Sequence, residues 1–140
     1  MADLKLVIGA TDGKCHQVVM NEDQAAILHG MKIGDNLAGD NLGFAGYEFL
    51  ITGGSDKCGF PMRKGIQEPR KRVLIGKGVG FCGKKRRLGK KTTRKTQYGL
   101  LRRRTVCGER ITKIIHQVNV KVVKEGSPKL GETPAENSVQ

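Results

Sequence analysis

Four cysteines and three histidines are the side chains of this sequence that could bind a metal or take part in catalysis. The cysteines form no CxxC pair, whereas a zinc site usually takes two ligands from one short loop. We therefore predict buried, reduced thiols and no metal site, with a zinc site or a disulfide as the alternatives. The histidines make no Ser-His-Asp grouping, so nothing in the sequence argues for catalysis. The residues concerned are Cys15, Cys58, Cys82, Cys107, His16, His29 and His116.

Positive charge is the second chemical feature, and it is concentrated in one stretch. The 40 residues between Glu68 and Glu109 hold 15 lysines and arginines and no acid, whereas the rest of the chain holds 11 basic and 13 acidic residues. The formal net charge of +13 therefore comes from this stretch alone. Such a surplus repels itself unless a polyanion neutralises it, which predicts a nucleic-acid partner.

The cations of this stretch are the candidate RNA-binding residues. Arginine can grip phosphate with a planar fork and stack on bases, and lysine adds a point charge. A solvated face or an anionic lipid surface is the alternative, but no acids interleave with the bases, and no lipid anchor is visible. We expect the part from Lys84 to Arg104 to be disordered until it binds RNA. The candidates are Arg70, Lys71, Arg72, Lys77, Lys84, Lys85, Arg86, Arg87, Lys90, Lys91, Arg94, Lys95, Arg102, Arg103 and Arg104.

Two glycine-rich patterns in the same stretch imitate nucleotide-binding motifs. Residues 78–85 read GVGFCGKK, which nearly matches GxxxxGK[ST], but Lys85 stands where the magnesium-binding hydroxyl should be. The glycines of residues 76–80 lack the dinucleotide spacing, and no βαβ unit follows. We therefore expect no cofactor and no small-molecule substrate.

Short alternating runs separated by glycine-rich turns predict the secondary structure. Asn21 and Gln24 suit a capping box at the start of one short helix, which Gly30 would end. We expect residues 34–46 to form a loop and residues 53–57 to break the strand before them. The predicted strands are residues 4–8, 15–20, 47–52, 72–75 and 114–122. We expect the aromatic face of residues 47–52 to point inward, and the last strand to carry Ile114, His116, Val118, Val120 and Val122 on one face.

These elements indicate a mainly β fold: a small β-barrel-like domain with one short helix and a long basic loop or extension. Residues 1–125 would form a single β-rich domain that contains the basic RNA-binding segment, residues 70–108. Residues 126–140 would be a flexible polar tail. No run of about 18 apolar residues is available to span a membrane, and the first residues carry no secretory signal. We therefore expect a cytoplasmic protein.

One long string carries a family resemblance. Residues 42–62 read LGFAGYEFLITGGSDKCGFPM, which closely resembles the signature of small-subunit ribosomal protein six of archaea and eukaryotes. The likeness extends over roughly residues 3–126, through Lys64-Gly65, residues 77–81, Arg86-Arg87 and residues 120–126. The bacterial protein of the same number is unrelated. The long C-terminal helix and serine cluster of eukaryotic members are missing, so the chain resembles the short, archaeal-type form.

The resemblance implies a structural constituent of the small (30S-type) ribosomal subunit, cytoplasmic and in ribosomes, that supports subunit assembly and translation. Its implied partners are ribosomal RNA and neighbouring ribosomal proteins, with no catalytic residue. We expect three glycines of the signature to set backbone geometry, and residues 55–57 to lie on an exposed loop that touches RNA or protein. A loop needed only for folding is the alternative. The signature-loop residues are Gly53, Gly54, Ser55, Asp56, Lys57, Gly59, Phe60 and Pro61.

Two other functions fit the basic segment. A free-standing RNA chaperone or chromosomal protein needs the same cations, and an RNA-acting enzyme could use them to capture its substrate. The enzyme also needs a reactive constellation in the near-neutral remainder of the chain, where we find none. Stoichiometric association with one ribosomal subunit separates a ribosomal protein from a chaperone, which is mostly free.

Overall fold

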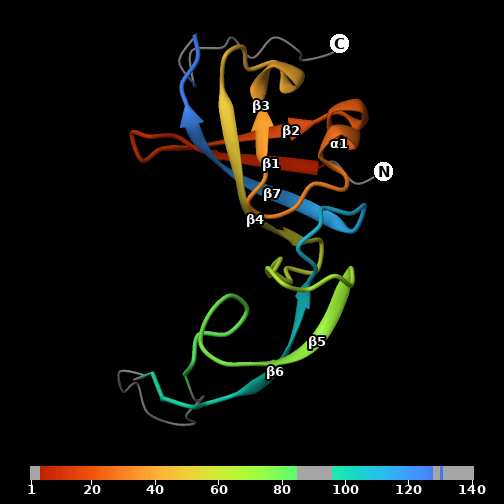
Figure 1. The fold of residues 1–140 in the computed structure, drawn as a ribbon, viewed down its shortest axis with the longest axis vertical. Coiled ribbons are helices and arrows are strands. Elements are labelled where there is room, and N and C mark those ends of the chain that lie inside the picture. Colours follow the sequence, from red (N-terminus) through yellow and green to blue (C-terminus); the bar gives the residue numbers. More distant parts are fainter. Residues whose placement is uncertain (1–3, 85–95, 128–129, 131–140) are drawn as a thin grey trace.

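A computed structural model describes residues 4–84, 96–127 and 130 of the chain. Strands dominate it, with one α-helix and one short 3-10 helix among the described residues (Figure 1). The elements are β1 (Leu4–Gly9), β2 (Cys15–Met20), α1 (Glu22–Leu28), β3 (Asn36–Ala38), η1 (Gly39–Leu42), β4 (Glu48–Asp56), β5 (Arg70–Ile75), β6 (Arg102–Cys107) and β7 (Ile115–Lys124).

The strands form two separate sheets, one in the upper part of Figure 1 and the other in the lower part. Five of them pair in the order β2-β1-β7-β4-β3, and we call this sheet, with α1 and η1, the body. The other two, β5 and β6, make an antiparallel ribbon that we call the arm, together with the described residues between them. The mainly β prediction is confirmed. Neither sheet is closed, so barrel-like describes the fold only loosely.

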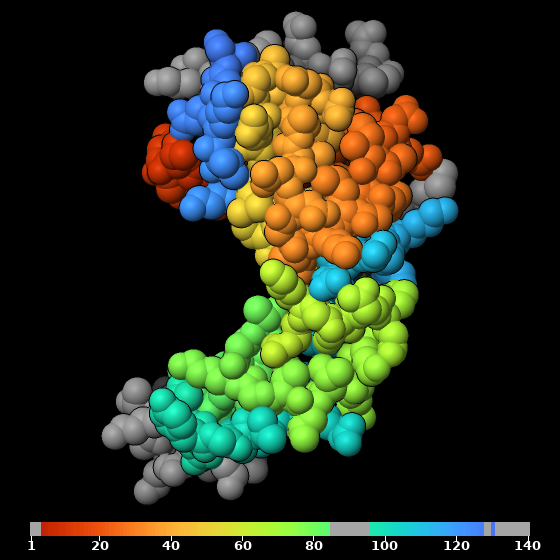
Figure 2. Space-filling model, viewed as in Figure 1, coloured from red at the N-terminus to blue at the C-terminus, as the bar shows by residue number. Residues whose placement is uncertain are grey.

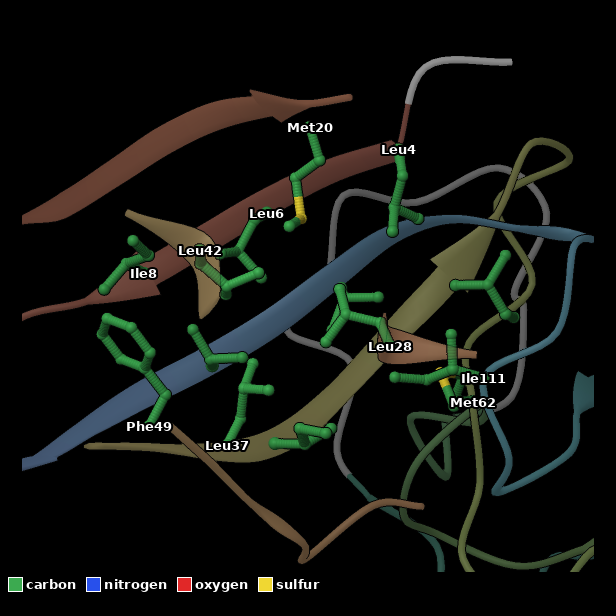
Figure 3. Packing of buried hydrophobic residues seen from close by; sticks show 14 of the residues in the cluster. Leu4, Leu6, Ile8, Met20, Leu28, Leu37, Leu42, Phe49, Met62 and Ile111 are labelled. Carbon is green, nitrogen blue, oxygen red and sulfur yellow. The ribbon is translucent and has the colours of Figure 1, made fainter. Parts of the chain in front are cut away.

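Hydrophobic alternation places the body core between the sheet and the elements that cover it. Alternate residues of β1 and β7 are buried, among them Leu6, Ile8, Val118 and Val120. Phe49 of β4 is buried with them, and Leu28 of α1 packs into the same cluster (Figure 3). The prediction that the aromatic face of residues 47–52 points inward is therefore confirmed.

The predicted strands 4–8 and 15–20 and the predicted helix are also confirmed. β1 and β2 pair antiparallel from Leu4 with Met20 to Gly9 with Cys15. The backbone N–H of Asn21 donates to Oε1 of Gln24 at 3.2 Å, and α1 starts at the next residue. Gly30 has a φ of +92°, a left-handed conformation that favours glycine and ends helices.

Three predictions about secondary structure are wrong. Residues 34–46 hold β3 and η1 rather than only a loop, because β3 pairs with β4. The glycines of residues 53–57 do not break the strand, since β4 continues to Asp56 by pairing with β7. Ile114 is exposed instead of sharing the buried face, because it lies in a turn before β7. In this turn the Ile115 N–H donates to the Thr112 carbonyl.

The arm has its own small core. Ile75, Phe81 and Val106 are buried together, separately from the body cluster. The space-filling view shows the body and the arm as two lobes joined through a narrower region (Figure 2). The predicted polar tail, residues 126–140, lies outside the described residues except for residues 126, 127 and 130.

Candidate nucleic-acid interface

The candidate cations gather on the arm. Arg70, Lys71 and Arg72 begin β5, Arg102, Arg103 and Arg104 begin β6, and Lys77 and Lys84 lie between the two strands. These eight are the described members of the predicted set. Seven further candidates lie outside the described residues: Lys85, Arg86, Arg87, Lys90, Lys91, Arg94 and Lys95.

Arg102, Arg103 and Arg104 lie in a strand rather than in a disordered segment. They pair with Ile75, Leu74 and Val73 of β5 in an unbroken antiparallel register. The expectation that this stretch is disordered without RNA is therefore wrong for β6. Backbone pairing with β5 and the burial of Val106 supply the order that the charge pattern did not predict.

The register of the ribbon divides its cations between two faces, because directly opposed residues in an antiparallel pair project to the same side. On one face Val73 opposes Arg104, and Ile75 opposes Arg102. This face covers the arm core, and the Arg104 guanidinium lies 5.6 Å from the centre of the Phe81 ring. Arg104 is thus held by a cation–π contact within the arm.

The opposite face of the ribbon carries Arg72 and Arg103 together with exposed Leu74. Arg72 opposes Thr105, and Leu74 opposes Arg103, so the two arginines are diagonal neighbours. Both arginines are exposed, and neither forms an ion pair with any acid in the part of the chain that the structure describes. Like charges placed this close repel unless an external anion lies between them. We call Arg72, Leu74, Arg103 and Thr105 the outer face of the arm.

Two other cations of the arm already have acidic partners. Lys71 pairs with Glu68 three residues before it, on the surface. Arg70 pairs with Asp56, whose side chain is fully buried. The structure therefore separates candidates that are engaged inside the protein from those that face outward, a distinction that charge counting cannot make.

The signature loop lies where β4 leaves the body sheet and the chain turns toward the arm. Gly54 and Ser55 remain in β4, and Lys57 is exposed in the turn that follows. Phe60 and Pro61 are half-buried. The expectation that Asp56 lies on an exposed loop is wrong: it is 3% exposed, because an N–H, a thiol and a guanidinium surround its carboxylate.

The glycines of the signature differ in what they do. A Cβ on Gly54 would lie 2.3 Å from the backbone oxygen of Gln117, so β7 can approach this closely only because no side chain is present. Gly59 adopts a φ of +85°, which favours glycine. Gly53 has neither constraint, and a Cβ there would meet nothing within 4 Å. The expectation about backbone geometry is therefore supported for Gly54 and Gly59 and not for Gly53.

Sequence reasoning missed two buried partners near this loop. Cys107 donates its thiol to Oδ2 of Asp56 at 3.4 Å. Glu109, which is 9% exposed, accepts hydrogen bonds from the Gly65 N–H and the Gln67 amide, both at 2.8 Å. These hydrogen bonds lower the pKa of Glu109 below its ordinary value. In the sequence the two residues are marked only by their position, because Glu109 ends the acid-free stretch and Cys107 lies just before that end.

The groups considered for metal binding and catalysis are dispersed. Among the described residues no three His, Cys, Asp or Glu side chains gather where they could hold a metal ion. The prediction of buried thiols is wrong for Cys15, Cys58 and Cys82, which are exposed, and right for Cys107. All four are free cysteines in the structure. No helix within the described ranges is long and apolar enough to cross a membrane.

A mainly β body that carries a cationic two-stranded arm has the charge distribution expected of proteins that bind a polyanion. The family model described as ribosomal protein S6e matches residues 4–134, and the chain belongs to this family. Its relatives include proteins named small ribosomal subunit protein eS6. The one from Methanosphaera stadtmanae is 38% identical over 131 residues, covering 93% of this chain and 92% of its own length. The one from Methanococcus maripaludis is 39% identical over 135 residues, covering 96% and 97%.

A third relative of the same name, from Methanoculleus marisnigri, is 36% identical over 134 residues, covering 94% of this chain and 92% of its own length. The predicted resemblance to the archaeal and eukaryotic family is confirmed. The family consists of ribosomal structural proteins, so the prediction that the chain is not an enzyme is confirmed as well.

Proposed function

We propose that this chain is a structural constituent of the small ribosomal subunit in the cytoplasm and that its arm binds ribosomal RNA. Membership of the S6e family and the names of its archaeal relatives support the ribosomal part. Ribosomal RNA and neighbouring ribosomal proteins are the partners that follow from it. The proposal goes further than the family by assigning RNA contact to particular residues.

The observation that carries the RNA-binding part is the outer face of the arm. Arg72 and Arg103 lie there as diagonal neighbours without acidic partners among the described residues. A regular ribbon fixes the backbone positions of the two arginines before RNA arrives, so less backbone entropy is lost on binding. Phosphate oxygens are the ligands that suit such exposed arginines.

The test is the salt dependence of RNA binding by the full chain. Affinity for a small-subunit ribosomal RNA transcript should fall by about 0.7 to 0.9 log units per phosphate contact for each tenfold increase in salt. Replacing Arg72 and Arg103 together by Gln should weaken binding and lower this slope by about 2. The measurement is fluorescence anisotropy across a series of potassium chloride concentrations.

The matched control neutralises two exposed body lysines, Lys113→Gln and Lys121→Gln, which lie outside the arm. It removes the same net charge, so a general loss of positive charge would affect both double variants alike. A slope that changes equally in both would contradict the assignment to the outer face. Sedimentation of the native protein at the top of a sucrose gradient, away from the small subunit, would contradict the ribosomal role.

A further inference from the structure

The arm is joined to the body at the point where three strand ends meet. Asp56 is the last residue of β4 in the body sheet. Arg70 is the first residue of β5, Cys107 is the last of β6, and the two are opposed at the base of the arm. One carboxylate from the body therefore lies against the first residue pair of the arm.

The contacts of Asp56 use both of its oxygens. Oδ1 accepts the backbone N–H of Phe60 at 2.8 Å. Oδ2 accepts the Cys107 thiol at 3.4 Å and forms an ion pair with the Arg70 guanidinium. A buried carboxylate is tolerated only when such donors replace water, so this site is organised around a charge.

Arg70 is held from two directions. Its guanidinium reaches the Asp56 carboxylate, and it lies 5.2 Å from the centre of the Phe60 ring. The Arg70 side chain is 38% exposed, yet its charged group is already paired within the protein. Arg70 therefore differs from Arg72 and Arg103, although all three belong to the same basic stretch.

The protonation states suit this arrangement. Burial of Asp56 by itself would raise its pKa, but the Phe60 N–H, the Cys107 thiol and the Arg70 guanidinium together lower it below the ordinary value. Burial and the hydrogen bond to Asp56 raise the pKa of the Cys107 thiol to about 11. At neutral pH the carboxylate is charged and the thiol keeps the proton that it donates.

The ion pair is distinctive in the described parts of the chain because it links the two sheets. The other ion pairs there do not link the sheets: Lys14–Asp12 lies in the turn between β1 and β2, Lys124–Glu48 joins two strands of the body, and Lys71–Glu68 joins residues three apart. Backbone hydrogen bonds tie Cys107 to the same loop, with its N–H donating to the Pro61 carbonyl at 2.8 Å. The junction thus combines a fixed backbone with one charged side-chain contact.

We propose that Asp56 and Arg70 form a clamp that fixes the orientation of the arm relative to the body, and that Arg70 is a positioning residue rather than a phosphate contact. The statement that Arg70 does not contact phosphate rests on the proposed function, whereas the statement about the orientation of the arm does not. The proposal gives Asp56 of the signature loop a structural role within the protein, in place of contact with a partner.

The orientation can be measured without RNA. Cys15 in β2 and Cys82 in the arm are exposed, and Cys107 is buried, so spin labels can be attached to the two lobes in a Cys58→Ser background. Pulsed electron–electron double resonance should give a narrow distribution of distances between the labels at Cys15 and Cys82 in the parent. Asp56→Asn, which keeps the shape of the side chain and removes its charge, should broaden or shift it.

Two further variants make the result decisive. Glu48→Gln is the matched control, because it converts a carboxylate on the same strand to an amide and removes an ion pair within the body. It should leave the distribution unchanged. Arg70→Gln removes the charge and the planar fork that pair with Asp56, so it should behave like Asp56→Asn, and it provides the answer if the latter fails to fold. A parental distribution in folded Arg70→Gln or in folded Asp56→Asn overturns the clamp.

RNA binding then tests whether Arg70 is a positioning residue, because the two interpretations predict affinity changes in opposite directions. Asp56→Asn makes the protein more positive, so charge alone predicts tighter binding to RNA. A loosened arm predicts binding that is about fivefold weaker, because orientation must be fixed on association, with the salt slope unchanged. Tighter binding by Asp56→Asn, or a salt slope that falls by about 1 in Arg70→Gln, overturns the positioning role. If the parent binds no ribosomal RNA, the proposed function fails, while the distance measurement still decides the clamp.

Discussion

Neighbouring residues of the signature loop have unequal roles at the residue scale. Gly54 and Gly53 are adjacent and chemically identical, yet only Gly54 faces the backbone of β7 at a distance that excludes a side chain. Asp56 and Lys57 are also adjacent, and one is buried while the other is exposed. The conspicuous string in the sequence is therefore a mixture of packing requirements and surface positions.

The two glycines provide a matched pair of substitutions. Gly54→Ala should lower the free energy of unfolding by about 3 kcal/mol, because the new methyl group meets a strand backbone that cannot move aside easily. Gly53→Ala should change it by less than about 1 kcal/mol and in the stabilising direction, since the unfolded chain loses freedom and no contact is strained. Urea denaturation measures both, and equal losses would contradict the difference in steric environment.

Asp56 also gives the protein a characteristic response to acid. Its pKa is lowered on folding from an ordinary value of 3.8. A carboxyl group whose pKa is depressed in the folded state contributes stability that is complete above the unfolded pKa and is lost as the pH falls through the folded one. We expect the urea concentration at the unfolding midpoint of the parent protein to decrease as the pH is lowered below about 3.8. For Asp56→Asn this decrease should be smaller.

The effect of Asp56 is the difference in stability between the parent and Asp56→Asn at each pH. The difference is needed because Glu109 also has a lowered pKa and contributes to the acid-induced loss of stability in both proteins. At pH 7 the Asn variant should be less stable by about 2 kcal/mol, since donors to the carboxylate lose their acceptor. Curves for the two proteins that stay parallel down to pH 2 would show that Asp56 does not titrate with unfolding.

Two cores of very different size organise the molecule at the element scale. The body cluster draws on strands from both ends of the chain and on α1. The arm core consists of Ile75, Phe81 and Val106 with a few half-buried neighbours. A ribbon of two strands is marginally stable by itself in water, so these few apolar contacts decide whether the outer face exists before RNA is present.

A pair of phenylalanines separates the two cores experimentally. Phe81→Ala should remove about 3 kcal/mol or more of packing from the arm and expose the amides of β5 and β6 to hydrogen exchange while β1 and β7 stay protected. Phe49→Ala, in the body, should lower protection throughout the chain. Hydrogen exchange followed by mass spectrometry reads both, and a uniform loss of protection in Phe81→Ala would mean that arm and body unfold as one unit.

Sequence reasoning succeeded where the determining contacts are local or repeat along the chain. The alternation of Tyr47, Phe49 and Ile51 marks a strand with a buried face, and Asn21 with Gln24 marks a helix start. It failed where the decisive partner is distant. Gly54 stays in β4 because it pairs with Val118, and Asp56 is buried because Arg70 and Cys107 supply donors.

The same limit explains what could be predicted of the candidate interface. An acid-free stretch of 40 residues locates the cationic region from composition. Composition cannot tell that Arg104 lies against Phe81, that Arg70 is paired with Asp56, or that Arg72 and Arg103 share an outward face. Those assignments depend on strand register, and register is set by contacts between β5 and β6 across 26 intervening residues.

At the scale of the whole molecule, β7 lies between β1 and β4 and runs parallel to β1. It is also the last of the described strands to be synthesised. The central position of the body sheet therefore stays empty on the nascent chain until β7 has emerged, whereas both strands of the arm are already available. During translation the cationic ribbon can form and meet its partner while the body is still incomplete, so the order of synthesis favours capture by the arm before closure of the body core.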